Sequence, residues 1–347
     1  MKITDIRAVY PNSGRPLSSW RGEFWQIIVR VDTDTGAHGW GYGGGGSAAV
    51  SIVERHLCHH LRGRSVDSPE QIAAIWDDLY LESTPYGRRG LAILALSGVD
   101  LALWDCLARS EGRRVCDLLS EAPLAQVIAY ATGSDLSLFR DRGYTATKAS
   151  LRPDRGDDEM VERSQAWVME ARRVMGAETR LMIDAYMGWS AVLAQRVADP
   201  LRDELFFVED VLLPDLVEEL SILRPQLHPV QLAGGEHDVT DYAFAELERH
   251  RALDIWQPDV TWCGGITAAL RIARRAQAAG VPVCWHRGGE VWGLHLIAAG
   301  YGMNLAEFHE ASRVPESLLF EGEPLVSEGV LNMPESAGFG VRPRHPL

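Results

Sequence analysis

Apolar and polar residues in the first third of the chain form a pattern that predicts strands followed by helices. The strands are expected at Ile3–Val9, Phe24–Val31 and Gly39–Tyr42, and the helices at Ala48–Leu61, Pro69–Leu81 and Gly90–Ser110. Short alternating runs are typical of half-buried strands, and apolar residues three and four apart are typical of amphipathic helices. Strands and helices in this order indicate an α+β module.

From about residue 125 the pattern changes to short apolar runs, each followed by a helical stretch. Eight runs are expected to be strands: Val127–Tyr130, Ala146–Lys148, Leu181–Asp184, Phe206–Glu209, Val230–Ala233, Asp254–Gln257, Val281–Trp285 and Asn304–Glu307. Helical patterns such as Asp158–Met175 and Ile266–Ala279 lie between them. Such alternation implies parallel strands, and eight of them suggest a closed β/α barrel.

Several of these strands end in a charged or ionisable residue, although a fully buried parallel strand is expected to be apolar throughout. The residues at the strand ends are Lys148, Asp184, Glu209, His286 and Glu307, and Glu236 and Asp259 follow just after their strands. In a β/α barrel the strand ends converge at one mouth, where barrel active sites lie. These side chains are therefore expected to share one site.

Asp184, Glu209 and Glu236 come from three successive strands. Three carboxylates brought together repel one another unless a cation holds them. Oxygen ligands suit a hard divalent ion, and Mg²⁺ is the usual choice where substrate oxygens complete the coordination shell. The alternative is three unrelated acids at helix N-termini, each stabilised by a helix dipole. Their equivalent places on three strands favour the metal site.

His286 follows the seventh strand, and histidine is a suitable general base at neutral pH. Asp259, from the preceding strand, could hold the imidazole and stabilise its cationic form. A lone histidine is more often structural, and the chain has 11, so the case for His286 rests on its place at a strand end. The other histidines considered, His59, His60, His295 and His309, have no such argument and are expected to be structural or solvent-facing.

Charge and cysteine content argue against several classes of protein. With 48 acidic and 34 basic residues the net charge is −14 at pH 7, which disfavours nucleic-acid binding. An anionic substrate stays compatible with this charge, because a bound cation would dominate the local field. The five cysteines are odd in number and include no CxxC pair, which argues against a disulfide framework and a thiolate metal site. A reduced cytoplasm is the simplest expected location.

The chain start and the apolar runs give no sign of export or of a membrane span. Met1–Asp5 is followed by no apolar core of a signal peptide, and no apolar run approaches the roughly 20 residues that a span needs. The glycines Gly43–Gly46 lack the GK[ST] that would follow them in a phosphate-binding loop, so a mobile loop is expected there.

The ordered set Lys148, Asp184, Glu209, Glu236, Asp259, His286 and Glu307 resembles the mandelate racemase branch of the enolase superfamily. The resemblance covers nearly the whole chain: Leu103–Asp105 with Cys116–Leu119 is similar to the family's junction between cap and barrel, and Gly338–Val341 to its C-terminal segment. Within this branch the closest likeness is to acid-sugar dehydratases, those acting on L-rhamnonate among them. Three segments carry that likeness: Asp184–Trp189, Gly235–His237 and Gln257–Thr267.

The resemblance implies an enolase-type modified (β/α)8 barrel with an α+β capping domain. Residues 1–120 would form the cap, to which the tail 320–347 returns, and residues 121–319 would form the barrel that carries the active site. Family members are commonly oligomers, so a homo-oligomer, a dimer or an octamer, is expected.

The resemblance also implies a mechanism. Mg²⁺ held by the three carboxylates would bind the substrate carboxylate and stabilise the enediolate formed when the α-proton leaves. His286, backed by Asp259, would take that proton and then help to expel the hydroxyl on the next carbon. An aldonate would thus become a 2-keto-3-deoxy acid. Lys148 and Glu307 would contact the carboxylate end.

One departure from the family bears on the reaction. Family racemases carry a Lys-x-Lys pair whose second lysine is the base on the opposite face, whereas this chain has Lys148, Ala149 and Ser150, and serine cannot act as that base. Elimination can run with one base that later serves as acid, so dehydration is favoured. Racemisation or epimerisation stays open if Lys148 titrates, and so does a barrel that only binds metal and ligand.

Substrate contacts are harder to assign, because the N-terminal region is short and differs from that of the rhamnonate enzymes. Trp20, Arg21 and His38 are candidate contacts from the cap, and the alternative is surface or rim packing. His237 beside Glu236 is a candidate contact to a substrate hydroxyl, and the alternative is a structural hydrogen bond. The hypothesis is a magnesium-dependent hydro-lyase for a small carboxylate, with neither nucleic acid nor membrane as partner.

Overall fold

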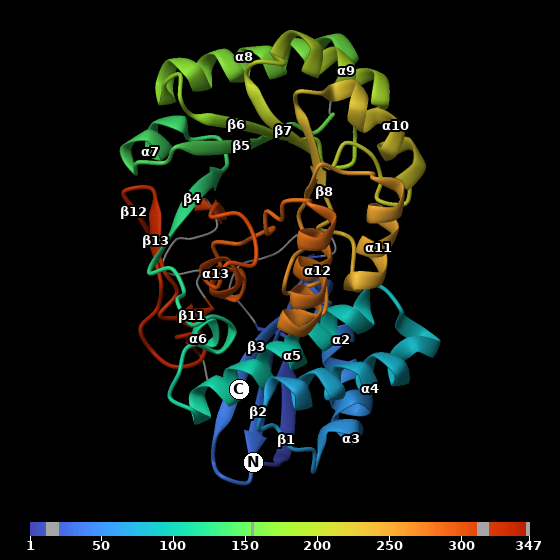
Figure 1. The fold of residues 1–347 in the computed structure, drawn as a ribbon, viewed down its shortest axis with the longest axis vertical. Helices are drawn as coiled ribbons and strands as arrows, with labels where there is room; N and C mark the ends of the chain where they lie inside the picture. Colours follow the sequence, from blue (N-terminus) through green and yellow to red (C-terminus); the bar gives the residue numbers. More distant parts are fainter. Residues whose placement is uncertain (12–20, 154–155, 311–318, 345–347) are drawn as a thin grey trace.

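The structure, a computed structural model, describes residues 1–11, 21–153, 156–310 and 319–344. The N-terminal region is an α+β unit, as predicted. Its antiparallel sheet has the order β1 (Ile3–Val9), β2 (Gln26–Thr33), β3 (His38–Gly44). Its helices are α1 (Arg21–Phe24), α2 (Gly46–Ile52), the π-helical segment η1 (Val53–Leu57), α3 (Cys58–Leu61), α4 (Pro69–Gly87) and α5 (Leu91–Ser110). Figure 1 shows this unit in blue and teal below the rest of the chain.

The glycines Gly43–Gly46 are not a mobile loop, and that prediction is wrong. Gly43 and Gly44 end β3, Gly46 begins α2, and all four glycines are buried. The reason is the close approach of β3 to α5: a Cβ on Gly43 would lie 2.5 Å from the carbonyl oxygen of Leu94. Glycine is needed here because any side chain would push the strand off the helix.

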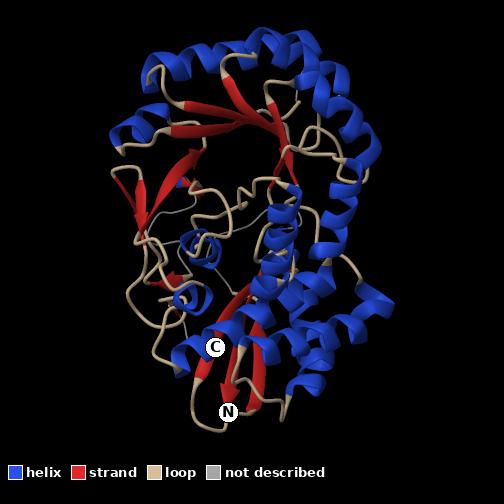
Figure 2. Cartoon of the chain, viewed as in Figure 1, coloured by secondary structure: helices blue, strands red, loops and turns tan. Residues whose placement is uncertain are grey.

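The second region is a barrel of parallel strands, as predicted. Its strands are β4 (Gln126–Thr132), β5 (Ala146–Ser150), β6 (Arg180–Asp184), β7 (Leu205–Glu209), β8 (Gln231–Gly234), β9 (Ile255–Trp256) and β10 (Ala306–His309), and β10 pairs with β4. The helices that alternate with them are α7 (Leu136–Asp141), α8 (Asp157–Met175), α9 (Ala191–Ala198) with η2 (Asp199–Leu201), α10 (Val217–Leu227), α11 (Thr240–His250), α12 (Gly265–Ala279) and α13 (Val291–Ala298). Figure 2 shows α8 to α11 as an outer layer around the strands.

The predicted strand Val281–Trp285 is irregular in the structure. It makes a single β-bridge, between Val283 and Trp256. Pro282 has no N–H to donate, which prevents a continuous ladder. The segment still fills the gap between β9 and β10, because Cys284 N donates to Trp256 O (2.9 Å) and Met303 N donates to Val283 O (2.8 Å).

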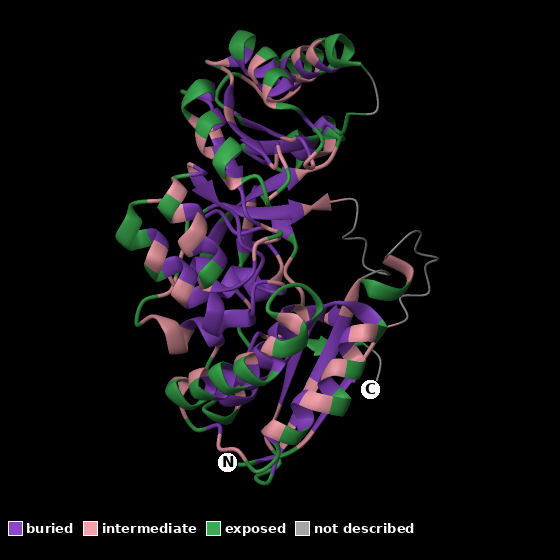
Figure 3. Ribbon diagram, turned by 90° about the vertical axis from the view of Figure 1, so that its right-hand side faces the viewer, coloured by how far each residue is buried: buried purple, intermediate pink, exposed green. Residues whose placement is uncertain are grey.

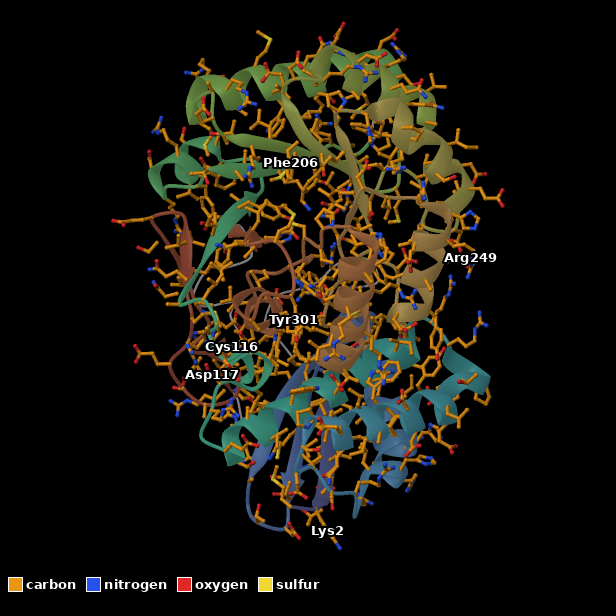
Figure 4. All side chains as sticks on the ribbon, viewed as in Figure 1. Lys2, Cys116, Asp117, Phe206, Arg249 and Tyr301 are labelled. Carbon is orange, nitrogen blue, oxygen red and sulfur yellow. The ribbon has the colours of Figure 1, made fainter. Side chains whose placement is uncertain are left out.

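The inside of the barrel is a layer of buried side chains, one from each of the eight predicted strand segments. Its members are Tyr130, Ala146, Met182, Phe207, Ala233, Ile255, Cys284 and Leu305. Phe206, labelled in Figure 4, packs against this layer. In Figure 3 the barrel strands are largely buried, and exposed residues lie on the outer helices. The barrel is therefore a filled core, as in other β/α barrels.

The C-terminal segments run back to the N-terminal region. The strands β11 (Phe320–Glu321) and β14 (Arg342–Pro343) pair with each other, and β12 (Val326–Ser327) and β13 (Val330–Asn332) extend the sheet from β4. Phe339 N donates to Asp105 Oδ1 on α5 at 2.8 Å, and Val115 N at the start of α6 (Val115–Leu119) donates to Gly338 O. The tail thus contacts α5 and α6, while the domain limits at residues 120 and 320 stay a prediction.

Among the described helices, α5 alone is long and apolar enough to cross a membrane, although no apolar run of that length was expected. Of its apolar window, 89% is buried inside the protein. The helix packs against β3 on one side and α12 on another. This burial is typical of the core helix of a folded domain.

Candidate active site

Polar side chains replace the apolar ones just beyond the interior layer. Side chains on a strand alternate, so a residue two positions beyond a member of that layer faces the same way. At seven such positions the chain has Thr132, Lys148, Asp184, Glu209, Gln257, His286 and Glu307. Glu236 and Asp259 lie slightly further along their segments. The contacts below bring these side chains together at the C-terminal mouth of the barrel.

Lys148 lies at the centre of the group. Its Nζ is 2.6 Å from both carboxylate oxygens of Glu209 and 2.8 Å from Glu307 Oε1. Burial alone would lower the pKa of Lys148, but the carboxylates of Glu209 and Glu307 outweigh burial and hold that pKa well above its usual value. The side chain is therefore a charged ammonium that links two acids. Gln257 Nε2 also donates to Glu209 Oε2, at 2.6 Å.

The three predicted metal ligands are crowded. Asp184 and Glu209 are paired across β6 and β7. Burial raises the pKa of Glu209 to about 8 against the opposing effect of Lys148, and Asp184 adds to the rise. Burial and Glu236 likewise raise the pKa of Asp184. A divalent cation would relieve this repulsion, and carboxylate oxygens are the ligands that Mg²⁺ prefers, so the residues fit such an ion.

A fourth acid, Asp210, joins this group and was missed by sequence reasoning, although it directly follows Glu209. Ligand atoms of Asp210, Glu236 and His237 lie within 4.8 Å of one another. His237 Nε2 is 3.2 Å from Glu236 Oε1, and the His237 ring stacks on Trp262 at 6.2 Å. Burial, then Glu236 and Glu209, hold the pKa of Asp210 well above its usual value. His237 thus lies beside the predicted metal ligands.

His286 and Asp259 form a buried pair. His286 Nδ1 is 3.0 Å from Asp259 Oδ2, and its Nε2 is 2.9 Å from Glu236 Oε2. The backbone N and the side-chain Oγ1 of Thr261 both donate to Asp259 Oδ1 at 2.7 Å. Burial would lower the pKa of His286, but Glu236 and Asp259 raise it well above its usual value. Since Asp259 occupies Nδ1, Nε2 is the nitrogen that faces the carboxylates.

Glu307 is held from several sides. Besides Lys148, it accepts hydrogen bonds from Thr132 Oγ1 at 2.6 Å and from the Arg287 backbone N at 2.9 Å. His309 Nε2 is 3.3 Å from Glu307 Oε1, and the ring is 6.3 Å from that of His286. His309 therefore lies beside the site, while its side chain is 39% exposed, in agreement with the expectation that it faces solvent. The two-residue period that places His309 on the face of Glu307 would also have found Thr132 and Gln257.

The backbone just beyond the strands is strained. Four non-glycine residues there have positive φ: Tyr186 (52°), Met187 (58°), Asp210 (45°) and Arg287 (53°). Such conformations cost of order 1–3 kcal/mol each and collect at functional sites. The strain follows strand ends that carry Asp184, Glu209 and His286, which agrees with a site at this mouth.

The N-terminal region covers one side of the mouth through the end of β3. Arg287 Nη2 donates to Tyr42 Oη at 3.2 Å, and the guanidinium lies 5.4 Å from the Tyr42 ring and 5.9 Å from the Trp262 ring. Arg287 is also paired with Glu290 at 2.6 Å and lies 3.6 Å from Asp259. Arg287, which sequence reasoning missed, therefore joins β3 to the His286–Asp259 pair.

The predicted cap contacts have different outcomes. Arg21 lies in α1 and stacks over Trp25 at 4.5 Å. This helix contacts α2, which follows the end of β3. At that end of β3 Gly44 approaches Trp262. Arg21 therefore lies near the end of the N-terminal sheet that faces the mouth. Trp20 lies outside the described residues.

His38 is not brought to the site, in contrast to its assignment as a substrate contact. It begins β3, and its ring contacts Trp40 at 6.0 Å. The end of β3 near Trp262 is Gly44. With a rise of about 3.3 Å per residue, His38 is roughly 20 Å from that end.

The chain is similar to known proteins over almost its whole length. It matches the family models "Mandelate racemase / muconate lactonizing enzyme, N-terminal domain" over residues 19–120 and "Enolase C-terminal domain-like" over residues 134–346. It is 33% identical over 327 residues to an L-rhamnonate dehydratase of Saccharopolyspora erythraea, which covers 91% of this chain and 82% of that protein.

Two solved structures extend the comparison. A rhamnonate dehydratase from Gibberella zeae complexed with Mg has a TM-score of 0.87 and 25% identity, and the alignment covers 99% of this chain and 94% of that one. A racemase from Streptomyces coelicolor with bound magnesium has a TM-score of 0.82 and 26% identity, with coverage of 98% and 97%.

Proposed function

Because this chain belongs to the mandelate racemase and muconate lactonizing enzyme family of the enolase superfamily, we propose that it is a magnesium-dependent hydro-lyase that dehydrates a sugar acid. One observation carries the proposal: a crowded set of carboxylates and the His286–Asp259 pair lie at the same barrel mouth. The carboxylates suit a cation that binds an acid substrate, and the pair suits proton removal at the next carbon. The similarity to L-rhamnonate dehydratases supports an aldonate of that kind as substrate.

With Mg²⁺ bound to Glu236, the carboxylate that does most to raise the pKa of His286 would be neutralised, so the imidazole would be neutral. His286 would then accept the α-proton at Nε2, the nitrogen that Asp259 leaves facing the carboxylates. Asp259, fixed by Thr261, would stabilise the imidazolium that results. The same proton would then pass from Nε2 to the hydroxyl on the adjacent carbon, which leaves as water. Tautomerisation of the enol gives a 2-keto-3-deoxy acid, so substrate and product differ by one water molecule.

Asp184, Glu209 and Glu236 would hold the Mg²⁺, which supplies positive charge where negative charge develops on the substrate carboxylate. Lys148 would add its own charge at the carboxylate end. Glu307 would keep Lys148 in place at 2.8 Å and would position the backbone N of Arg287 beside the site.

Racemisation or epimerisation is the alternative, and the similarity to a racemase gives it a reason. Inverting a stereocentre needs proton transfer on both faces of the substrate. Ser150, the register partner of Asp184, is exposed at the mouth and cannot act as the second base. Lys148 is paired with two carboxylates and held as an ammonium. Both observations favour dehydration.

The test is a screen of aldonic and aldaric acids with Mg²⁺, beginning with L-rhamnonate and detecting the 2-keto product by semicarbazide absorbance. We expect His286→Asn to lower kcat by about 10²–10⁴-fold, the usual contribution of a general acid–base residue. His250→Asn is the matched control, since His250 is the last residue of α11 and lies at the opposite end of the barrel. Its kcat should equal that of the wild type.

Other outcomes would redirect the proposal. If none of the acids yields a 2-keto product, dehydration is wrong. Exchange of the α-proton in deuterated water that depends on His286 would then indicate epimerisation. Absence of both reactions would indicate a barrel that only binds metal and ligand.

A further inference from the structure

We propose that the N-terminal region carries a second metal site, formed by His56, His60 and Glu82, that takes a borderline transition ion such as Zn²⁺. One ring nitrogen of each histidine and one oxygen of Glu82 lie within 4.8 Å of one another. Ligands about 2.1 Å from a tetrahedral zinc are about 3.4 Å apart. Small rotations of these side chains therefore close the site. The proposal does not depend on the reaction at the barrel mouth.

The local fold brings the two histidines onto one face. His56 lies in η1 and His60 four residues later in α3, and residues four apart on a helix are neighbours. Their rings are 5.1 Å apart at 74°. The π-helical turn η1 is itself unusual, since such turns are rare and often occur at functional sites. Glu82 completes the set from the neighbouring helix α4.

Tyr86 gives this cluster the second layer that metal sites usually have. Its Oη is 2.7 Å from Nδ1 of His56, and it lies one turn beyond Glu82 on α4. A partner on one ring nitrogen fixes the ring and leaves the other nitrogen for an ion, as in the outer shell of known sites. Here Nε2 of His56 is the nitrogen left for the ion. Glu82 is exposed, so water can reach the fourth position of a tetrahedral ion.

The ligand types separate this site from the one at the barrel mouth. Two imidazoles and one carboxylate suit Zn²⁺, whereas a set of carboxylates suits Mg²⁺. An ion at the new site would also join α3 to α4, two helices of the N-terminal region. An ion that binds the folded chain in preference to the unfolded one raises the unfolding temperature by mass action.

The experiment uses the full chain, stripped of metal and then saturated with Mg²⁺ so that the mouth is occupied. ZnCl₂ is titrated by calorimetry and by thermal unfolding, and crystals soaked in ZnCl₂ are measured at the zinc edge. The variants are His60→Ala and Glu82→Gln, and His59→Ala is the matched control because His59 is an exposed neighbour on α3.

We expect an anomalous peak between η1 and α4 in the wild type and in His59→Ala. Loss of one of three ligands should weaken zinc binding there by at least about 10–100-fold, a loss that even outer partners of a metal can cause. The zinc-dependent rise in unfolding temperature should disappear with it. Activity with Mg²⁺ alone should stay unchanged in each variant.

Two results would overturn the proposal. One is the absence of a zinc peak at this cluster together with the same titration in wild type and His60→Ala. The other is a fall in unfolding temperature in His60→Ala that is equal with and without zinc, because it would show that the rings serve only for packing. Should His60→Ala fail to fold, Glu82→Gln decides the question, since Glu82 is exposed.

Discussion

Two sets of buried carboxylates in this protein are held in opposite ways. In the core of the N-terminal region, Asp100 on α5 accepts hydrogen bonds from the backbone N of Thr267 (2.9 Å) and from its Oγ1 (2.6 Å), at the start of α12. Asp105, five residues further along α5, accepts from the backbone N of Trp40 and of Phe339, both at 2.8 Å. Each acid is matched to donors from other parts of the chain.

At the barrel mouth the acids instead face one another. Burial and then neighbouring acids raise the pKa of Asp184 and of Glu209. Together with Glu236, these acids share the same few cationic partners, chiefly Lys148 and His286. Burial alone therefore does not distinguish a structural acid from a functional one. The partners of the acid distinguish the two cases. An acid that accepts hydrogen bonds from other elements has a structural role, and an acid that faces other acids belongs to a cation site.

The sharpest way to break this comparison is Asp184→Asn. We expect kcat/KM to fall by at least about 10²-fold, because the metal supplies several kcal/mol of charge stabilisation. Stability without Mg²⁺ should stay equal or rise, since a repelled charge is lost while Oδ1 can still accept from Tyr186 N at 2.7 Å. Kinetics and thermal unfolding with and without Mg²⁺ measure both effects. Clear destabilisation of the metal-free variant would show that this acid is structural.

The converse change is Asp100→Asn, for which we expect lower stability with kcat unchanged. The amide offers one acceptor where the carboxylate offers two, so a buried donor of Thr267 loses its partner. Such a loss costs about 1–3 kcal/mol. Urea unfolding measures the difference. An unchanged midpoint would remove the distinction between the two sets.

The same pair of proteins gives a pH test. Burial raises the pKa of Asp100 to about 7, against the lowering effect of Thr267. The unfolded value is about 3.9, so the folded chain binds more protons between about pH 4 and pH 7. The contribution of Asp100 to stability therefore falls as pH rises through that window and levels off above it. The advantage of wild type over Asp100→Asn should shrink accordingly, and an advantage that grows with pH would contradict the assignment.

The smallest expected effect is that of Tyr42→Phe, at the contact between β3 and the mouth. The ring that stacks on Trp292 at 6.0 Å is kept. Two hydrogen bonds are lost, the one that Tyr42 Oη accepts from Arg287 and the one that it donates to Gln26 Oε1, and the first of these reaches the mouth. A hydrogen bond contributes a net of about 0.5–1.5 kcal/mol, so losing the one at the mouth should lower kcat/KM about 2–10-fold. A loss as large as that of Asp184→Asn would make the N-terminal contact part of the catalytic machinery.

Sequence patterns predicted the strands of the barrel because each carries its own apolar run. The polar ends of those strands were visible for the same reason. Thr132 and Gln257 were missed because their types drew no attention, although the two-residue period places them among Lys148 and Glu209. The two-residue period was informative wherever the position of a side chain depends on its own strand and not on a neighbouring element.

Features that depend on which elements meet could not be predicted this way. The glycines at the end of β3 were interpreted as a loop because α5, whose backbone Gly43 approaches, lies some fifty residues further along the chain. His38 was assigned to the site because its sequence does not tell which end of β3 faces the barrel. Val281–Trp285 was expected to be regular because its apolar run outweighed the effect of Pro282.

The interior layer of the barrel also serves as the floor of the site. Its eight side chains, among them Tyr130 and Phe207, fill the barrel from wall to wall, directly beneath the polar residues. A substrate can therefore reach only the layer of polar residues above these side chains, and it must lie across the mouth. The strained turns beyond the strands and the end of β3 then select its length and the orientation of its hydroxyls. A change of substrate preference is therefore expected from substitutions in these turns and in the end of β3, with the interior layer left unchanged.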